Sequence, residues 1–143
     1  MSPARAKSNG LNSKVSARPY AWACTAGSAS FSEWSPEEPL PSTLDYVVAA
    51  VGGCLAGTLA GALGRRGIQT DPGQLVAEVE GQLEEVDGKL FLTDISVLYR
   101  LKVPKEKRAA AERALEHHDS ACPVSASVRR GITVHWKSEI EEE

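Results

Sequence analysis

Two segments of the chain alternate between apolar and polar residues with a period of two, the pattern of a strand that buries one face. The first covers residues 75–83 and the second residues 90–103. Asp87 and Gly88 lie between them, and this residue pair favours a tight hairpin turn. The pattern therefore predicts two antiparallel strands, and Pro104 ends the second one because proline has no N–H to donate to a ladder.

Helical patterns occur on either side of this hairpin. Residues 43–66 are apolar on nearly every side, which predicts a long helix that is buried all round. Ser42 and Asp45 fit a capping box at its start, and Gly67 suits the position after its C-terminal cap. Residues 105–118 are rich in Ala, Glu, Lys and Arg and predict an amphipathic helix.

Three shorter segments complete the expected elements. Residues 15–31 alternate around their aromatic side chains and predict one or two strands. Residues 123–130 predict a short helix that ends at Gly131, and residues 132–137 predict a last strand. The resulting order of strands and helices is not a regular βαβ alternation. It suggests an α+β fold in which helices pack on an antiparallel sheet.

The long helix also carries small residues at a spacing of four, at Gly53, Gly57 and Gly61. Each glycine inside a helix costs up to about 1 kcal/mol relative to alanine. Close approach of another backbone would compensate for that cost. Because the chain is short, we expect the partner to be the same helix of a second subunit.

The length of 143 residues suits one domain with a substantial core. We expect residues 1–14 to form a flexible tail, since they are polar. Residues 15–138 would form the single domain. Residues 139–143, "EIEEE", would form an acidic tail.

Charge and composition exclude several classes of protein. The formal net charge is −3 and no basic field is present, so we expect no nucleic-acid partner. The uncharged run 47–63 is short for a bilayer span and rich in glycine, so we expect no membrane insertion. The N-terminus has no apolar signal region. Three cysteines without an export signal then suggest a reducing cytoplasm.

The cysteines are the candidate reactive groups. Cys122 precedes Pro123, a residue type favoured at the first helical position, so Cys122 would be the N-cap of the short helix. A cysteine there is expected to have a lowered pKa and to be reactive as a thiolate, although a small residue that merely caps a turn fits as well. Cys54 lies among alanines and glycines, where a buried cysteine is often only a small hydrophobe. We interpret Cys24 as a core residue.

Other chemistry has weaker support. Three histidines, His117, His118 and His135, could join the cysteines as metal ligands, but no CxxC, HxH or HExxH spacing is present. The glycines of "VGGC" lack the lysine and hydroxyl of a phosphate-binding loop. We therefore expect neither a metal nor a cofactor.

Two motifs together carry a family resemblance. The helix segment "AAVGGCLAGTL", followed by a hairpin, a helix and "ACPVSASV", resembles the OsmC/Ohr family over residues 42–137. The resemblance implies an intertwined α+β homodimer, with long central helices packed against sheets from both subunits. It also implies a thiol peroxidase in which Cys54 attacks a hydroperoxide and Cys122 resolves the sulfenic acid as a disulfide. A dithiol then reduces that disulfide.

The chain departs from the peroxidase pattern of that family at two points. The resemblance implies a proline and a glutamate shortly before the first cysteine, and Thr43 and Leu44 stand at those positions. Asp45 follows, and we interpret it as a helix cap. The resemblance also implies an N-terminal arginine that lowers the cysteine pKa; Arg18 is the nearest candidate, and no motif marks it. The sequence is thus most similar to the broader OsmC-like branch.

Two functions from different classes remain open. The first is an enzyme, a cytoplasmic homodimer that reduces a small organic hydroperoxide with Cys54, Cys122 and a dithiol reductant. The second is a non-enzymatic protein, either a small-molecule-binding protein or a thiol redox sensor that uses a cavity at the dimer interface. The cysteine pair favours the first function, and the missing glutamate and arginine favour the second.

Overall fold

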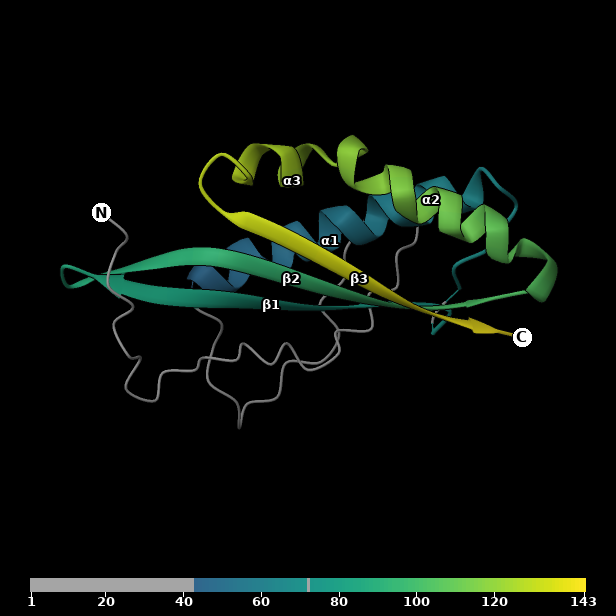
Figure 1. Cartoon of the computed structure of the whole chain (residues 1–143), viewed down its shortest axis with the longest axis horizontal. Helices are drawn as coiled ribbons and strands as arrows, with labels where there is room; N and C mark the ends of the chain where they lie inside the picture. The colour runs from purple at the N-terminus through teal and green to yellow at the C-terminus, as the bar shows by residue number, and fades with distance from the viewer. Residues whose placement is uncertain (1–42, 72) are drawn as a thin grey trace.

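The chain folds into one three-stranded sheet with its helices on one face, as a computed structural model of residues 43–71 and 73–143 shows (Figure 1). In chain order the elements are α1 (Thr43–Gly64), β1 (Leu75–Val86), β2 (Lys89–Val103), the 3₁₀ turn η1 (Lys105–Lys107), α2 (Arg108–Ala121), α3 (Pro123–Val128) and β3 (Thr133–Glu142). The predicted α+β class is confirmed. The strands expected within residues 15–31 lie outside the described residues, as does the expected tail 1–14.

β1 and β2 form the predicted hairpin. They pair antiparallel, and Asp87 and Gly88 between them have φ angles of 52° and 79°. Positive φ at both central residues is what a two-residue turn of type I′ requires. β1 is longer than its apolar alternation suggested, because its last residues, 84–86, still pair with residues 89–91 of β2.

The inward face of the hairpin forms one side of the core. Alternate residues of β1 and β2 are buried and lie opposite one another, among them the pairs Ala77–Tyr99 and Val79–Val97. The pairing shifts by one residue between Gln82 and Leu83, and the buried alternation of β1 ends at this bulge. The alternation in the sequence thus identifies the buried face up to the bulge.

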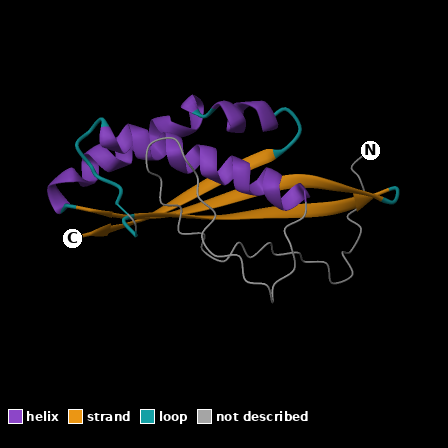
Figure 2. Ribbon diagram, turned by 180° about the vertical axis from the view of Figure 1, so that it is seen from behind, coloured by secondary structure: helices purple, strands orange, loops and turns teal. Residues whose placement is uncertain are grey.

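β3 corrects the expectation of a purely antiparallel sheet. It pairs parallel to β2, at the edge opposite β1. The helices α2 and α3 connect the two strands, and such a crossover returns the chain to the same end of the sheet. Figure 2 shows the helical layer on one face of the three strands.

β3 is also longer than predicted. Residues 139–142, expected to form most of an acidic tail, continue the strand and pair with residues 100–103. One reason is charge complementarity across the ladder, since Arg100 contacts both Glu78 of β1 and Glu139 of β3. The backbone N–H of Glu143 also donates to the carbonyl of Val103.

α1 ends as predicted. Gly67 has a φ of 73°, its N–H donates to the carbonyl of Gly64, and the N–H of Ile68 donates to Leu63. This pair of bonds is the Schellman motif, which satisfies carbonyls at a helix end. Ile68 and Leu63 are both buried, so the same turn returns the chain into the core.

The prediction that α1 is buried all round is wrong for the described chain. One face packs on the sheet through fully buried side chains such as Val51, Leu55 and Leu59. The opposite face is exposed and uncharged, and it includes Val47, Ala50, Gly57, Gly61 and Gly64. Within the part of the chain that the structure describes, no element covers this open face of α1.

The glycines of α1 therefore differ in their surroundings. A Cβ built on Gly52 would lie 2.8 Å from the Cβ of Val79, so the close approach of α1 to β1 requires glycine there. A Cβ on Gly57 or Gly64 would meet nothing within 4 Å. The close approach inferred from the sequence thus occurs within the chain at Gly52, whereas Gly57 belongs to the open face.

Candidate redox site

Cys54 is held on α1 by packing. The residues beside it, Val51 and Leu55, are fully buried, and α1 contacts β1, α2 and α3. Cys54 itself is only half-buried. The helix thus holds the sulfur in place while leaving part of the residue open to small molecules.

Cys122 is held by hydrogen bonds at the bend between α2 and α3. Its backbone N–H donates to the carbonyl of Asp119 at 3.2 Å, and its carbonyl accepts from the N–H of Ala126 at 3.1 Å. Its Sγ accepts from the N–H of Ser125 at 3.4 Å, so Cys122 is the N-cap of α3, as predicted. Pro123 follows at the first helical position, where its missing N–H costs nothing.

The two sulfurs meet although 68 residues separate them in the chain. The Sγ of Cys122 lies 3.0 Å from the Sγ of Cys54, in hydrogen-bonding geometry with Cys122 as the donor. Both cysteines are free thiols, and Cys122 is fully buried. A disulfide has an S–S distance of about 2.05 Å, so if one sulfur were oxidised, a movement of only about 1 Å would bring the pair to bonding distance.

The pKa of Cys122 is raised to about 11, opposite to the predicted direction. Burial is the main cause, because it disfavours the thiolate, and the hydrogen bond to Cys54 adds to it. The backbone N–H groups of Ser125 and Val124 act in the lowering direction and are outweighed. Cys122 is the helix cap, as predicted, but burial of its sulfur outweighs the effect of the helix start on its pKa.

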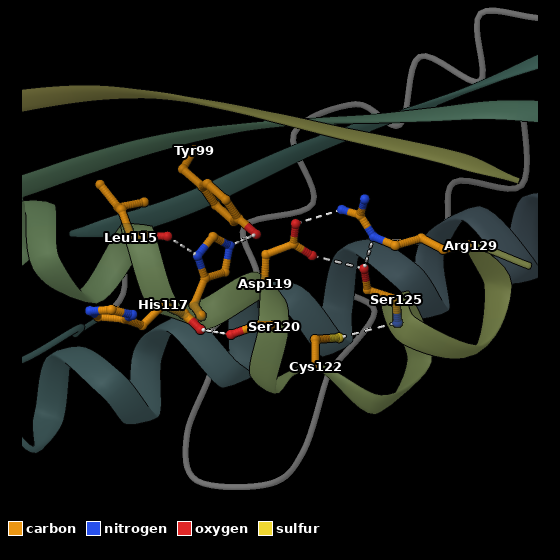
Figure 3. Close-up of polar contacts among 9 residues, drawn as sticks. Tyr99, Leu115, His117, Asp119, Ser120, Cys122, Ser125 and Arg129 are labelled. Carbon is orange, nitrogen blue, oxygen red and sulfur yellow. Dashed lines mark hydrogen bonds and ion pairs between the residues drawn. The ribbon is translucent and has the colours of Figure 1, made fainter.

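A polar cluster spans the bend that carries Cys122 (Figure 3). The hydroxyl of Ser125 donates to Oδ1 of Asp119 at 2.9 Å. Arg129 donates from Nε to the Ser125 hydroxyl at 3.0 Å and from Nη2 to Oδ2 of Asp119 at 2.5 Å. Each of the three side chains thus bonds to the other two. We call this set, Asp119, Ser125 and Arg129, the bend clamp.

A buried aromatic cluster lies on the other side of Asp119. Tyr99 and His118 are almost completely buried, and the Tyr99 hydroxyl lies 2.9 Å from Nε2 of His118. Nδ1 of His118 lies 2.5 Å from the carbonyl of Leu115, so Nδ1 carries the proton and Nε2 accepts from Tyr99. The ring of Trp136 lies 5.0 Å from that of His118. Burial lowers the pKa of His118 and raises that of Tyr99, so both groups are neutral.

Sequence reasoning missed the bend clamp and the buried histidine. Asp119 and Ser125 lie on different helices, and no repeated spacing marks residues that meet across a bend. The sequence pattern indicated His118 only as a weak candidate metal ligand. The available signal was Ser125, one of two serines in the motif "ACPVSASV", because a hydroxyl that becomes buried needs a partner.

Other candidate residues fall outside the site or outside the described chain. Cys24 and Arg18 precede the described residues, and so does Ser42 of the expected capping box. Asp45 is in the first turn of α1, as a helix-capping acid should be. In residues 43–71 and 73–143, no three metal-binding side chains of His, Cys, Asp or Glu gather at one point.

α1 also meets the length and hydropathy of a membrane span over Leu44–Gly64. Half of that segment is buried inside the fold. The core helix of a soluble protein has these same properties, so this finding is weak evidence for a membrane.

Comparison with protein-family models identifies one family. The family model described as "OsmC-like protein" matches residues 36–137. No curated protein sequence matches the chain.

Solved structures with the same fold come from several bacteria. The organic hydroperoxide resistance protein OsmC of Legionella pneumophila has a TM-score of 0.57 and 14% identity, with 72% of each chain covered. An OsmC-like protein of Mycoplasma pneumoniae has a TM-score of 0.56 and 14% identity over 68% of this chain and 70% of its own. The organic hydroperoxide resistance protein OhrB of Bacillus subtilis has a TM-score of 0.51 and 18% identity over 71% and 73%. At these identities the likeness shows the shared fold.

Proposed function

The chain belongs to the OsmC-like protein family, and from this premise we propose that it is a thiol peroxidase that reduces organic hydroperoxides with Cys54 and Cys122. The observation that carries the proposal is the contact of the two sulfurs at 3.0 Å. The names of the Legionella and Bacillus proteins, which refer to organic hydroperoxide resistance, support the substrate class.

The two sulfurs would divide the reaction according to their burial. Cys54 is the half-buried sulfur, so a hydroperoxide would meet it first. Its thiolate attacks the terminal peroxide oxygen and the O–O bond breaks. The alkoxide takes a proton and leaves as an alcohol, while Cys54 becomes a sulfenic acid.

Cys122 would then close the cycle. Its sulfur attacks the Cys54 sulfur, the S–O bond breaks, and the hydroxyl leaves as water with the thiol proton of Cys122. Because Cys122 is buried and its pKa is about 11, its sulfur remains a protonated thiol until Cys54 is oxidised, and it is protected from peroxide. A dithiol then reduces the disulfide by thiol–disulfide exchange. We place this cycle in a reducing cytoplasm, where such dithiols are maintained.

A homodimer is part of this proposal. The open face of α1 is uncharged and includes Val47, which is 37% exposed, and the exposed glycine Gly57. A second copy would cover it, and Gly57 would let the two backbones approach. Gly57→Leu should then overpack the contact, at a cost of about 1–3 kcal/mol. Sedimentation should show a dimer for the unchanged protein, and a stable monomer would contradict this part of the proposal.

The alternative is a thiol redox sensor or a small-molecule-binding protein. One observation favours this alternative. Leu44 stands where the family resemblance implies a glutamate. The carboxylate next to Cys122, Asp119, is already engaged by Ser125 and Arg129 and does not replace that glutamate. A sensor would be oxidised once per protein, whereas an enzyme would consume many equivalents of hydroperoxide when a dithiol is present.

The deciding experiment measures turnover and the oxidation products together. Cumene hydroperoxide and dithiothreitol should give continuous turnover in the wild type, and one equivalent of peroxide alone should give a Cys54–Cys122 disulfide in peptide mass spectra. Cys122→Ser should react once and retain a sulfenic acid or overoxidise. Cys54→Ser should be almost inert, and Cys24→Ser should match the wild type. If Cys54→Ser reacts as fast as the wild type, the proposed mechanism is wrong.

A further inference from the structure

We infer that the bend clamp is a positioning device for disulfide formation: Asp119, Ser125 and Arg129 hold the Cys122 sulfur at the distance from which it bonds to Cys54. This inference rests on the proposed redox role of the two sulfurs. These three residues would act in the step in which the disulfide forms. The earlier oxidation of Cys54 would depend on how α1 positions that sulfur.

Cys122 is the single residue between the end of α2 at Ala121 and the start of α3 at Pro123. The angle between the two helices therefore sets where its sulfur lies. The clamp joins them across this bend, because Asp119 is in the last turn of α2, Ser125 is in α3, and Arg129 is its C-cap.

Clamp residues also bond to Cys122 directly. The Asp119 carbonyl accepts from the Cys122 N–H, and the Ser125 N–H donates to the Cys122 sulfur. Each of these residues thus uses its backbone on Cys122 and its side chain on the clamp. Figure 3 shows the Ser125 and Arg129 side chains converging on the Asp119 carboxylate, with the Cys122 sulfur directed at the Ser125 nitrogen.

Ser125 is fully buried, and a buried hydroxyl without a hydrogen-bond partner destabilises the fold. Here it donates to Asp119 and accepts from Arg129, so its position is fixed from two sides. A residue needed only to fill space at this point would not require a hydroxyl, a carboxylate and a guanidinium that all bond to one another.

The experiment isolates the closing step with Ellman's reagent, an aromatic disulfide, on the full-length chain carrying Cys24→Ser. The reagent transfers one thionitrobenzoate to Cys54 and releases the other. Cys122 then attacks the Cys54 sulfur, the mixed disulfide breaks, and the second thionitrobenzoate leaves as the thiol. Two release phases are expected, and Cys122→Ser should show only the first.

Loss of the clamp should slow the second phase selectively. Asp119→Asn and Arg129→Gln should each slow it by about tenfold or more, since small misplacements of reacting atoms are costly. The first phase should stay within about twofold, because α1 positions Cys54. Arg129→Lys should lie between the wild type and Arg129→Gln, because a lysine has one nitrogen for the two contacts of Arg129.

The matched control is Glu112→Gln, which breaks the exposed ion pair of Arg108 and Glu112 on the same helix α2. It should leave both phases unchanged. Thermal melts identify any variant that fails to fold, and Arg129→Lys, which retains the charge at an exposed helix end, then decides the test. Folded clamp variants that close as fast as the wild type overturn the inference. Equal slowing of both phases also overturns it, since it indicates general loosening.

This test separates the clamp from the peroxidase proposal because it uses no hydroperoxide. Slow closure in the clamp variants, together with an absence of hydroperoxide turnover in the wild type, would support the clamp and reject the enzyme. Turnover in the wild type with unaffected closure in the variants would reject the clamp and retain the enzyme. If the wild type turns over hydroperoxide and the clamp variants also close the disulfide slowly, those variants should overoxidise at Cys54 at lower peroxide doses than the wild type.

Discussion

The two sulfurs are in contact, but the regions that carry them are built in different ways. α1 has no charged side chain after Asp45 and is positioned by packing, with its buried face against the sheet and Gly52 against Val79. The bend between α2 and α3 is positioned by polar contacts, through the clamp and the hydrogen bonds to Cys122.

This difference suggests what each region contributes. Packing by one face of a helix leaves the other sides free, and Cys54 is accordingly half-buried. Directed hydrogen bonds fix a single geometry, and Cys122 is fully buried within them. The accessible Cys54 sulfur is suited to react with a substrate, and the buried Cys122 sulfur is suited to react afterwards with oxidised Cys54.

The largest expected difference between the regions is in thiol reactivity. At about pH 8, a thiol with a pKa of about 11 is about 0.1% thiolate, against about a quarter for an ordinary cysteine. Iodoacetamide should therefore modify Cys122 at least about a hundredfold more slowly in the folded protein than after unfolding in urea. Peptide mass spectrometry of quenched samples of the reduced protein measures both rates.

Cys54 in the same samples provides the internal comparison. It should be alkylated faster than Cys122 in the folded protein. The two rates should become similar in urea, where neither sulfur is buried. Equal rates in the folded protein would show that the enclosure of Cys122 does not limit its chemistry, and the division between the two sulfurs would fail.

The sequence pattern predicted the helices and strands better than it predicted how they pair and pack. The uncharged run and Gly67 predicted α1, and Asp87-Gly88 predicted the hairpin, because these signals are local. The parallel pairing of β3 was missed, since a strand pattern does not specify its neighbour or its direction. The contact of Cys54 with Cys122 has no local signal either, because it depends on how α1 packs against α3.

The pKa of Cys122 also could not be predicted from the sequence. The N-cap role of Cys122 follows from the Cys-Pro step and is confirmed. The direction of its pKa does not follow, because burial depends on residues distant in sequence and outweighs the local helix-start effect. The bend clamp was missed for a related reason, since its residues meet only when two helices are joined at a particular angle.

A smaller effect should distinguish the two faces of α1. Gly52→Ala would place a Cβ 2.8 Å from Val79, which forces α1 away from β1. We expect a loss of about 1–3 kcal/mol in the free energy of unfolding. Gly64→Ala meets no atom of the described chain within 4 Å and lies about two turns from Gly57, where a second copy would approach, so it should gain up to about 1 kcal/mol from helix propensity. Urea unfolding measures both, and the same sign for both variants would contradict the assignment of faces.

Acid should weaken the region of the bend through His118. Burial lowers the pKa of this imidazole in the folded state, so below its ordinary value of about 6.5 the unfolded chain binds the proton more readily. The contribution of His118 to stability is thus present above that pH and is lost as the pH falls. Urea midpoints at about pH 7 and pH 5 should differ less for His118→Gln than for the wild type.

The neighbouring exposed histidine supplies the control for that measurement. His117→Gln should leave the pH dependence of the wild type unchanged, since His117 lies on the solvent side of α2. The acid effect would be assigned to the wrong residue if His117→Gln reduced the difference between the two midpoints and His118→Gln did not.

The smallest expected effect is at Asp45, the charged residue in the first turn of α1. It precedes Cys54 by nine residues, and at about 100° per residue the two lie on roughly opposite sides of the helix. Asp45→Asn keeps a hydrogen-bonding side chain and removes the charge, which should cost about 0.3–1 kcal/mol of stability. The rate of Cys54 oxidation by cumene hydroperoxide should be unchanged. A fall of about a hundredfold, or about 2.7 kcal/mol in the barrier, in a folded variant would show that this carboxylate takes part in the reaction. Packing would then not be the only means by which α1 prepares its sulfur, and the contrast with the bend would lose its main support.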